Sequence, residues 1–152
     1  FTVAFQTQLL SIKSGDRVLE VGTGSGYQAA ILAKMGAKVF SIERDGRLHR
    51  EAKERLEDLD LAVNLQLGDG SQGWKTERPY DAIVVTAASP SIPQSLKDQL
   101  AVGGRLVIPV GSLEKQRMYL VHRLSKAEWE TQILQAFKFV PLIGRFGFSE
   151  QI

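Results

Sequence analysis

The fold of this chain is indicated most clearly by residues 18–26, which read V-L-E-V-G-T-G-S-G. A short apolar run over residues 18–21 ends in three glycines that alternate with small polar residues. Such a run is typical of a buried strand that opens through a glycine-rich turn into a helix. Backbone N–H groups at the start of such a helix are accessible to a nucleotide-like ligand. The stretch therefore predicts a strand, a turn and a helix with a ligand site at the turn.

The spacing of the glycines separates two classes of cofactor. Gly22, Gly24 and Gly26 follow the pattern G-x-G-x-G, whereas the dinucleotide fingerprint needs its third glycine one position later, where this chain has Tyr27. The spacing disfavours NAD and favours a cofactor without a pyrophosphate, of which S-adenosylmethionine is the commonest. The alternative is a purely structural turn, although three glycines after a buried strand cost backbone entropy.

Composition limits the classes of protein to which the chain can belong. Its 152 residues, of which 43% are hydrophobic, are enough for one domain with a proper core. The net charge is only +2 and the densest charged stretch, residues 51–60, mixes both signs, so we expect no nucleic-acid partner. The absence of cysteine excludes disulfides and thiolate metal sites and fits a cytoplasmic location. No apolar run approaches the ~18 residues of a membrane span, so we expect no membrane partner.

Apolar periodicity alternates between strand and helix along most of the chain. We expect strands at 17–21, 38–42, 63–67, 80–86 and 105–110, and helices at 28–35, 45–59 and 93–100, after an N-terminal helical segment. This alternation predicts an α/β fold, a mostly parallel sheet with helices on both faces. Two further runs, 117–124 and 130–140, are joined by a turn too short for a crossover helix and are expected to form an antiparallel hairpin.

Acidic residues follow the second and third expected strands. Glu43 comes 17 residues after Gly26, at the place where nucleotide-binding sheets carry an acid that accepts hydrogen bonds from both ribose hydroxyls. Asp69 lies in a G-D-G loop after the third strand, where a carboxylate is suited to accept a hydrogen bond from an adenine amino group. Because the carboxyl ends of parallel strands share one edge, we expect both loops to lie beside the glycine turn.

The segment after the fourth strand offers no general base. It reads T-A-A-S-P at residues 86–90, without the Asn/Asp-Pro-Pro-aromatic run of base methyltransferases or the acidic ligands of metal-dependent ones. The two histidines, His49 and His122, fall on an expected helix and in the hairpin. A carboxylate is already ionised at pH 7 and needs no base to attack a sulfonium methyl. This composition favours O-methylation of a carboxylate, with catalysis resting on alignment.

Taken together, these stretches resemble the protein-L-isoaspartate O-methyltransferase family. The resemblance is carried by V-L-E-V-G-T-G-S-G-Y-Q-A-A, S-I-E-R, L-G-D-G-S-Q-G-W, Y-D-A-I-V-V-T-A-A, I-P-Q-S-L-K-D-Q-L-A-V-G-G-R-L-V-I-P-V-G and F-V-P-L-I-G, which span nearly the whole chain. It implies a Rossmann-like methyltransferase that moves a methyl group from S-adenosylmethionine, without a metal, to the free α-carboxylate of L-isoaspartyl residues. Its partners are then damaged proteins and peptides, and its role is protein repair.

The resemblance also implies a set of site residues. Gly22, Thr23, Gly24, Ser25 and Gly26 hold the methionine portion of the cofactor, Glu43 and Arg44 its ribose, and Gly68, Asp69 and Gly70 its adenine; Thr86, Ala87 and Ala88 line the methyl-transfer region, and Val140, Pro141, Leu142 and Ile143 shape the isopeptide groove.

One part of the family pattern is missing from this sequence. The family carries a T-I-S-Q-P-Y-like segment whose serine is implied to assist at the reacting carboxylate, and Phe1 aligns with the last aromatic residue of that segment. We therefore expect residues 1–152 to be a single methyltransferase domain that lacks its natural N-terminal segment. Two alternatives stay open: another Rossmann-like methyltransferase for a small molecule or nucleic acid, and a catalytically incomplete cofactor-binding core.

Overall fold

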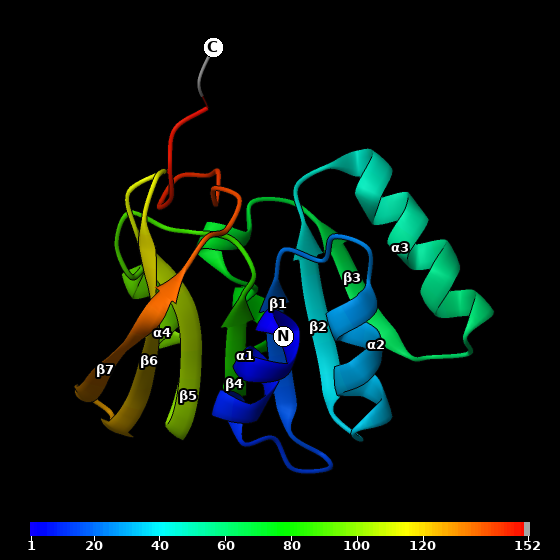
Figure 1. Cartoon of the computed structure of the whole chain (residues 1–152). Helices are drawn as coiled ribbons and strands as arrows, with labels where there is room; N and C mark the ends of the chain where they lie inside the picture. The colour runs from blue at the N-terminus through cyan, green and yellow to red at the C-terminus, as the bar shows by residue number, and fades with distance from the viewer. Residues whose placement is uncertain (151–152) are drawn as a thin grey trace.

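A computed structural model describes residues 1–150 and contains a seven-stranded sheet with helices on both faces (Figure 1). The strands are β1 Arg17–Val21, β2 Lys38–Glu43, β3 Val63–Leu67, β4 Tyr80–Val85, β5 Leu100–Gly111, β6 Gln116–Ser125 and β7 Glu128–Phe137. The helices are α1 Thr2–Leu10, α2 Tyr27–Lys34, α3 Gly46–Asp58 and α4 Gln94–Asp98, with short 3-10 turns at Gly70–Gln72 and Lys75–Glu77. None of the helices in the described part is long and apolar enough to cross a membrane.

The strand order places a topological switch in the middle of the sheet. The order is β3-β2-β1-β4-β5-β6-β7, in which β1 to β5 are parallel and β6 and β7 are antiparallel to their neighbours. From β1 the chain proceeds outward to β2 and β3, and from β4 it proceeds outward in the opposite direction. The predicted mostly parallel sheet with a C-terminal antiparallel hairpin is confirmed.

Strand ends differ from the sequence-based expectation at the Gly103–Gly104 pair. We expected a strand at 105–110 that follows this pair, but β5 begins at Leu100 and runs through it. The pairing with β4 shifts register between Tyr80 and Ala82, so the two glycines are absorbed as a bulge. A Cβ on Gly104 would lie 2.8 Å from the carbonyl oxygen of Ala101, which explains the need for glycine there.

Apolar side chains form a core on each face of the sheet. One face packs Val18, Val39 and Val84 against α1, α2 and α3, through residues such as Leu10 and Leu32. The other face carries a second apolar cluster under α4, whose members include Leu19, Val21, Phe40, Ile83, Leu96 and Ile108. Strands buried on both faces are expected of a parallel sheet between helices.

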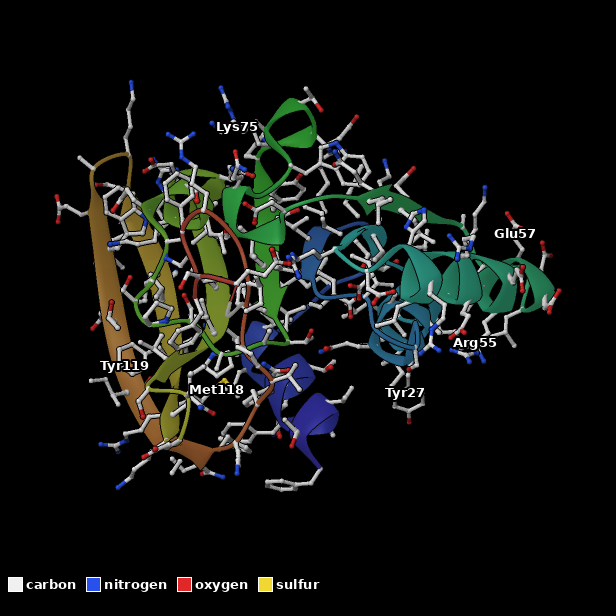
Figure 2. The ribbon with its side chains drawn as sticks, turned by 90° about the horizontal axis from the view of Figure 1, so that it is seen from above. Tyr27, Arg55, Glu57, Lys75, Met118 and Tyr119 are labelled. Atoms are coloured by element: carbon white, nitrogen blue, oxygen red, sulfur yellow. The ribbon has the colours of Figure 1, made fainter. Side chains whose placement is uncertain are left out.

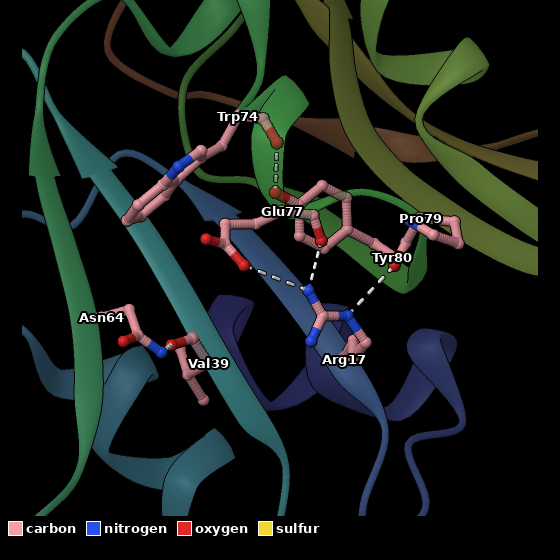
Figure 3. A network of polar contacts seen from close by, with 7 residues as sticks. All are labelled: Arg17, Val39, Asn64, Trp74, Glu77, Pro79 and Tyr80. Carbon is pink, nitrogen blue, oxygen red and sulfur yellow. Dashed lines mark hydrogen bonds and ion pairs between the residues drawn. The ribbon is translucent and has the colours of Figure 1, made fainter.

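The amino end of β1 is tied to the segment before β4 (Figure 3). The guanidinium of Arg17 donates to the backbone carbonyls of Glu77 and Pro79, and Tyr80 donates from its hydroxyl to Trp74 O at 2.5 Å. On the other side of the sheet centre, Asn64 of β3 donates to Val39 O of β2 at 3.2 Å. These contacts lie at the amino ends of the parallel strands, opposite the edge that carries the candidate site.

A buried carboxyl group lies inside the apolar core on β1. Glu20 is 0% exposed, and its Oε1 is 2.6 Å from Ser41 Oγ, which in turn is 2.6 Å from Thr23 Oγ1. Its second oxygen, Oε2, has no hydrogen-bond partner among residues 1–150. Burial raises the pKa of Glu20 to about 8, which the bond to Ser41 opposes and the charge of Glu43 reinforces. The carboxyl group is therefore largely protonated at neutral pH.

Glu20 is predicted to make the stability of the fold depend on pH. In the unfolded chain this carboxyl ionises near its ordinary pKa of 4.5, so between that pH and about 8 only the folded state holds the proton. Stability should therefore fall as pH rises through this window, by up to about 1.4 kcal/mol per pH unit. Glu20→Gln removes the titration, so its stability relative to the unsubstituted chain should rise steadily from pH 5 to pH 8.

Urea unfolding at several pH values measures this difference. Glu54→Gln, which changes an exposed carboxyl on α3, is the matched control and should give a profile parallel to that of the unsubstituted chain. A parallel profile for Glu20→Gln as well would show that Glu20 is ionised in the folded protein.

Candidate functional site

The candidate site lies where the chain directions diverge, at the carboxyl ends of β1 and β4. A pocket of about 330 Å³ opens there, which we call the switch-point pocket. It is lined by Val21, Gly22, Gly24, Ile42, Glu43, Arg44, Asp45, Leu48, Gly70, Thr86, Ala87, Val140, Pro141, Leu142 and Ile143. Open α/β sheets bind ligands in this crevice, and its volume is within the usual range for small-molecule sites.

Gly22 is required at the floor of the pocket by a close approach to Thr86. The Thr86 hydroxyl donates to the carbonyls of Gly22 at 2.7 Å and Val21 at 3.1 Å. A Cβ on Gly22 would lie 2.3 Å from that hydroxyl oxygen, and the φ of Gly22 is +98°. A side chain here would therefore both strain the backbone and separate the ends of β1 and β4.

Glu43 is the main buried charge of the pocket. It is 8% exposed; its Oε1 accepts from Gly24 N–H and its Oε2 from Asp45 N–H, both at 2.9 Å. Each carboxylate oxygen has a second lone pair, so both oxygens keep capacity for a ligand hydroxyl. Glu43 thus orders the glycine turn and lines the pocket at the same time.

The glycine turn is supported from two sides. On the sheet side, the hydroxyl groups of Thr23 and the buried Ser41 share a hydrogen bond. On the side of α3, Arg55 donates to Ser25 O at 3.1 Å. Figure 2 shows Arg55 and Tyr27 at the outer side of α3 and α2, directed away from the sheet. Thr23 and Ser25 therefore belong to the structure of the turn, and neither lines the pocket.

Asp69 has a structural environment that the sequence did not reveal. Its Oδ1 accepts from Ser71 N–H at 3.0 Å and Ser71 Oγ–H at 2.7 Å, and its Oδ2 accepts from the Gln72 amide at 3.1 Å and Arg145 N–H at 2.9 Å. Burial raises the pKa of Asp69, but these hydrogen bonds outweigh burial and hold it below its ordinary value. All four lone-pair positions of the carboxylate have donors from the protein.

The C-terminal part of the chain supplies the far wall of the pocket. Ala88 N–H donates to Val140 O, and Leu142 N–H donates to Ala88 O, each at 2.7 Å. These bonds lay residues 140–142 alongside the segment that follows β4. Figure 2, which looks onto this edge of the molecule, shows the red C-terminal segment passing over the sheet. Segments far apart in the sequence therefore face each other across the pocket.

The pocket brings together most of the predicted site residues. Among them, Gly22, Gly24, Glu43, Arg44, Gly70, Thr86, Ala87, Val140, Pro141, Leu142 and Ile143 line it, whereas Thr23, Ser25, Gly26, Gly68, Asp69 and Ala88 do not. Sequence reasoning missed Val21, Ile42, Asp45 and Leu48, which also line it. A signal was present for these residues, because Val21 and Ile42 directly precede Gly22 and Glu43, and Asp45 and Leu48 form the N-cap and first turn of α3.

The pocket offers few groups for acid–base chemistry. Within residues 1–150, the titratable side chains that line it are Glu43, Arg44 and Asp45, and Arg44 forms an ion pair with Glu150. His49 lies on α3 and His122 on β6, and neither is part of the lining. No cluster of metal-ligating side chains occurs in the described part of the chain. The arrangement is suited to binding and aligning reactants.

Comparisons with known sequences agree with these features. The family model described as Protein-L-isoaspartate(D-aspartate) O-methyltransferase (PCMT) matches residues 1–147. A protein-L-isoaspartate O-methyltransferase of Methanoculleus marisnigri is 52% identical over 154 residues, which cover 100% of this chain and 69% of that protein. One of Chlorobaculum tepidum is 49% identical over 152 residues, covering 99% of this chain and 70% of that protein.

Comparisons with solved structures support the same fold. A structure of a protein-L-isoaspartate O-methyltransferase superposes with a TM-score of 0.89 and 28% identity, covering 96% of this chain and 48% of that one. A putative protein-L-isoaspartate O-methyltransferase of Plasmodium falciparum, solved with S-adenosyl-L-homocysteine, has the same fold, with a TM-score of 0.80, 24% identity and coverage of 93% and 71%. The fold is therefore the Rossmann-like fold of S-adenosylmethionine-dependent methyltransferases. Because the family model matches residues 1–147, this chain belongs to the protein-L-isoaspartate O-methyltransferase family.

Proposed function

We propose that this chain is the core of an S-adenosylmethionine-dependent protein carboxyl methyltransferase that acts on the free α-carboxylate of L-isoaspartyl residues. The observation that carries this proposal is the switch-point pocket, whose two walls come from segments far apart in a chain that matches one family over residues 1–147. Gly22, Gly24 and Glu43 form the cofactor wall, and residues 140–143 form the wall for the peptide. The proposal includes repair of damaged proteins in the cytoplasm as the biological role.

The residues present fit S-adenosylmethionine. A Cβ on Gly24 would meet nothing within 4 Å, so the backbone there is open to a ligand, and Glu43 keeps one lone pair on each oxygen for the two ribose hydroxyls. Gly70 borders the adenine side, where Asp69 holds the loop in place and leaves the ring to contact backbone and apolar atoms such as those of Ile42. When bound, the cofactor supplies an electrophilic methyl group on a sulfonium.

An isoaspartyl carboxylate as methyl acceptor is consistent with a pocket that has few titratable groups. An isoaspartyl α-carboxylate is ionised at neutral pH and attacks without losing a proton, so no base is required. Thr86 and Ala87 then serve to border the reacting groups, while Val140 and Leu142 keep water away from them. Catalysis therefore rests on holding the carboxylate in line and on excluding solvent.

Cofactor binding is predicted to depend on Glu43. Glu43→Ala removes the acceptor for the ribose hydroxyls and the support of Gly24, so the affinity for S-adenosylhomocysteine should fall by roughly 1 to 3 kcal/mol. Calorimetric titration measures the change, and Glu54→Ala, an exposed change on α3, should leave the affinity unaltered. Equal affinities for the two variants would limit Glu43 to a structural role. If the unsubstituted chain did not bind S-adenosylhomocysteine, the proposed cofactor would be wrong.

Methyl transfer is predicted to distinguish isoaspartyl from aspartyl peptides. Labelled methyl transfer from S-adenosylmethionine is measured with two peptides that differ only in this linkage. Residues 1–152 are tested alone and preceded by the serine-containing segment that the family resemblance implies. Label should enter the isoaspartyl peptide, and faster with that segment present. Equal labelling of the two peptides would contradict the substrate assignment.

A further inference from the structure

The 140–148 loop is folded as a compact unit over the switch-point pocket. Phe148 N–H donates back to Leu142 O at 2.7 Å, and Gly144 N–H donates to Phe148 O at 3.2 Å. Leu142 is buried in the apolar core of the sheet, whereas Val140 is exposed at the pocket mouth. The loop is therefore anchored in the core at Leu142, and its tip, residues 144–146, is held by other contacts.

The tip of this loop is attached to the loop after β3. Arg145 N–H donates to Asp69 Oδ2 at 2.9 Å, and Phe146 N–H donates to Ser71 Oγ at 3.1 Å. Ser71 is fully buried and is itself held by Asp69 Oδ1. Asp69 therefore receives hydrogen bonds from both sides of the pocket, which are more than 70 residues apart in the sequence.

Gly144 shows how closely the two loops fit. A Cβ on Gly144 would lie 2.0 Å from Asp69 Oδ1 and 2.8 Å from Ser71 Oγ. The backbone of Gly144 has no positive φ, so its glycine is required by the contact and not by the conformation. Any side chain at this position must push the loop tip away from Asp69.

From these contacts we infer that Asp69 is a positioning residue that joins the cofactor side of the pocket to the peptide side. The inference rests on the proposed function. Asp69 holds Gly70 on one side and, through Arg145, the 140–143 wall on the other. Loss of the attachment frees the peptide wall while the glycine turn and Glu43 keep their contacts. The defect then falls on peptide binding more than on cofactor binding, and the two binding events are coupled through one carboxylate.

Two variants break the attachment from opposite sides. Asp69→Asn keeps one oxygen for Ser71 but places an amide N–H₂ group opposite donors of Gln72 or Arg145, whereas Gly144→Ala leaves Asp69 unchanged and displaces the loop tip. Both should raise the KM for an isoaspartyl peptide about tenfold, with kcat changed less and the affinity of Gly144→Ala for S-adenosylhomocysteine within about twofold. Gly46→Ala, at an α3 position with room for a methyl group, is the control.

Amide hydrogen exchange at Arg145 and Phe146 tests the attachment without relying on catalysis. Both amides should be protected in the unsubstituted chain and lose protection in Asp69→Asn and Gly144→Ala. An active chain whose peptide KM is unchanged in both variants would overturn the inference alone. Lost cofactor affinity in Asp69→Asn with a normal peptide KM would overturn it in favour of a direct adenine contact. An unsubstituted chain that protects these amides but methylates no isoaspartyl peptide would instead refute the proposed function.

Discussion

The contact between Gly22 and Thr86 is the constraint on which the site depends. β1 and β4 stay side by side up to their last residues, where Thr86 N–H donates to Val21 O at 3.0 Å. Beyond that point Gly22 N–H donates to Ile42 O of β2, while the segment after β4 turns toward β5. The pocket is the space that this divergence opens. A side chain on Gly22 would collide with Thr86 at the place where the two segments separate.

Polar groups placed inside an apolar sheet support this geometry at a thermodynamic cost. Glu20, Ser41 and Thr23 form a buried chain of hydrogen bonds that ends in the glycine turn. A neutral carboxyl in such a place costs less than an ionised one, yet Oε2 of Glu20 still lacks a partner in the described part of the chain. An apolar residue would pack at that position of β1 without this cost, but it would not hold Ser41 beneath Thr23.

Local pattern predicted the framework well, because each element carries its own signal. The alternation of strands and helices and the position of Glu43 beside the glycine turn were both predicted from single segments. Asp69 was different: G-D-G places the carboxylate near a cofactor, but its hydrogen bond to Arg145 depends on how a distant loop returns. Likewise, the bulge at Gly103–Gly104 depends on its pairing with Tyr80. Long-range contacts of this kind leave little local trace.

The antiparallel hairpin has a consequence for the order in which the pocket is completed. β6 and β7 carry the chain outward from β5 and back, so the segment that faces Thr86 is among the last parts of the sequence. During synthesis from the N-terminus, the strands around the glycine turn emerge well before residues 140–148. A growing chain therefore contains the glycine turn and Glu43 before it contains the facing wall of the pocket. Only a chain translated past residue 143 contains both walls of the pocket.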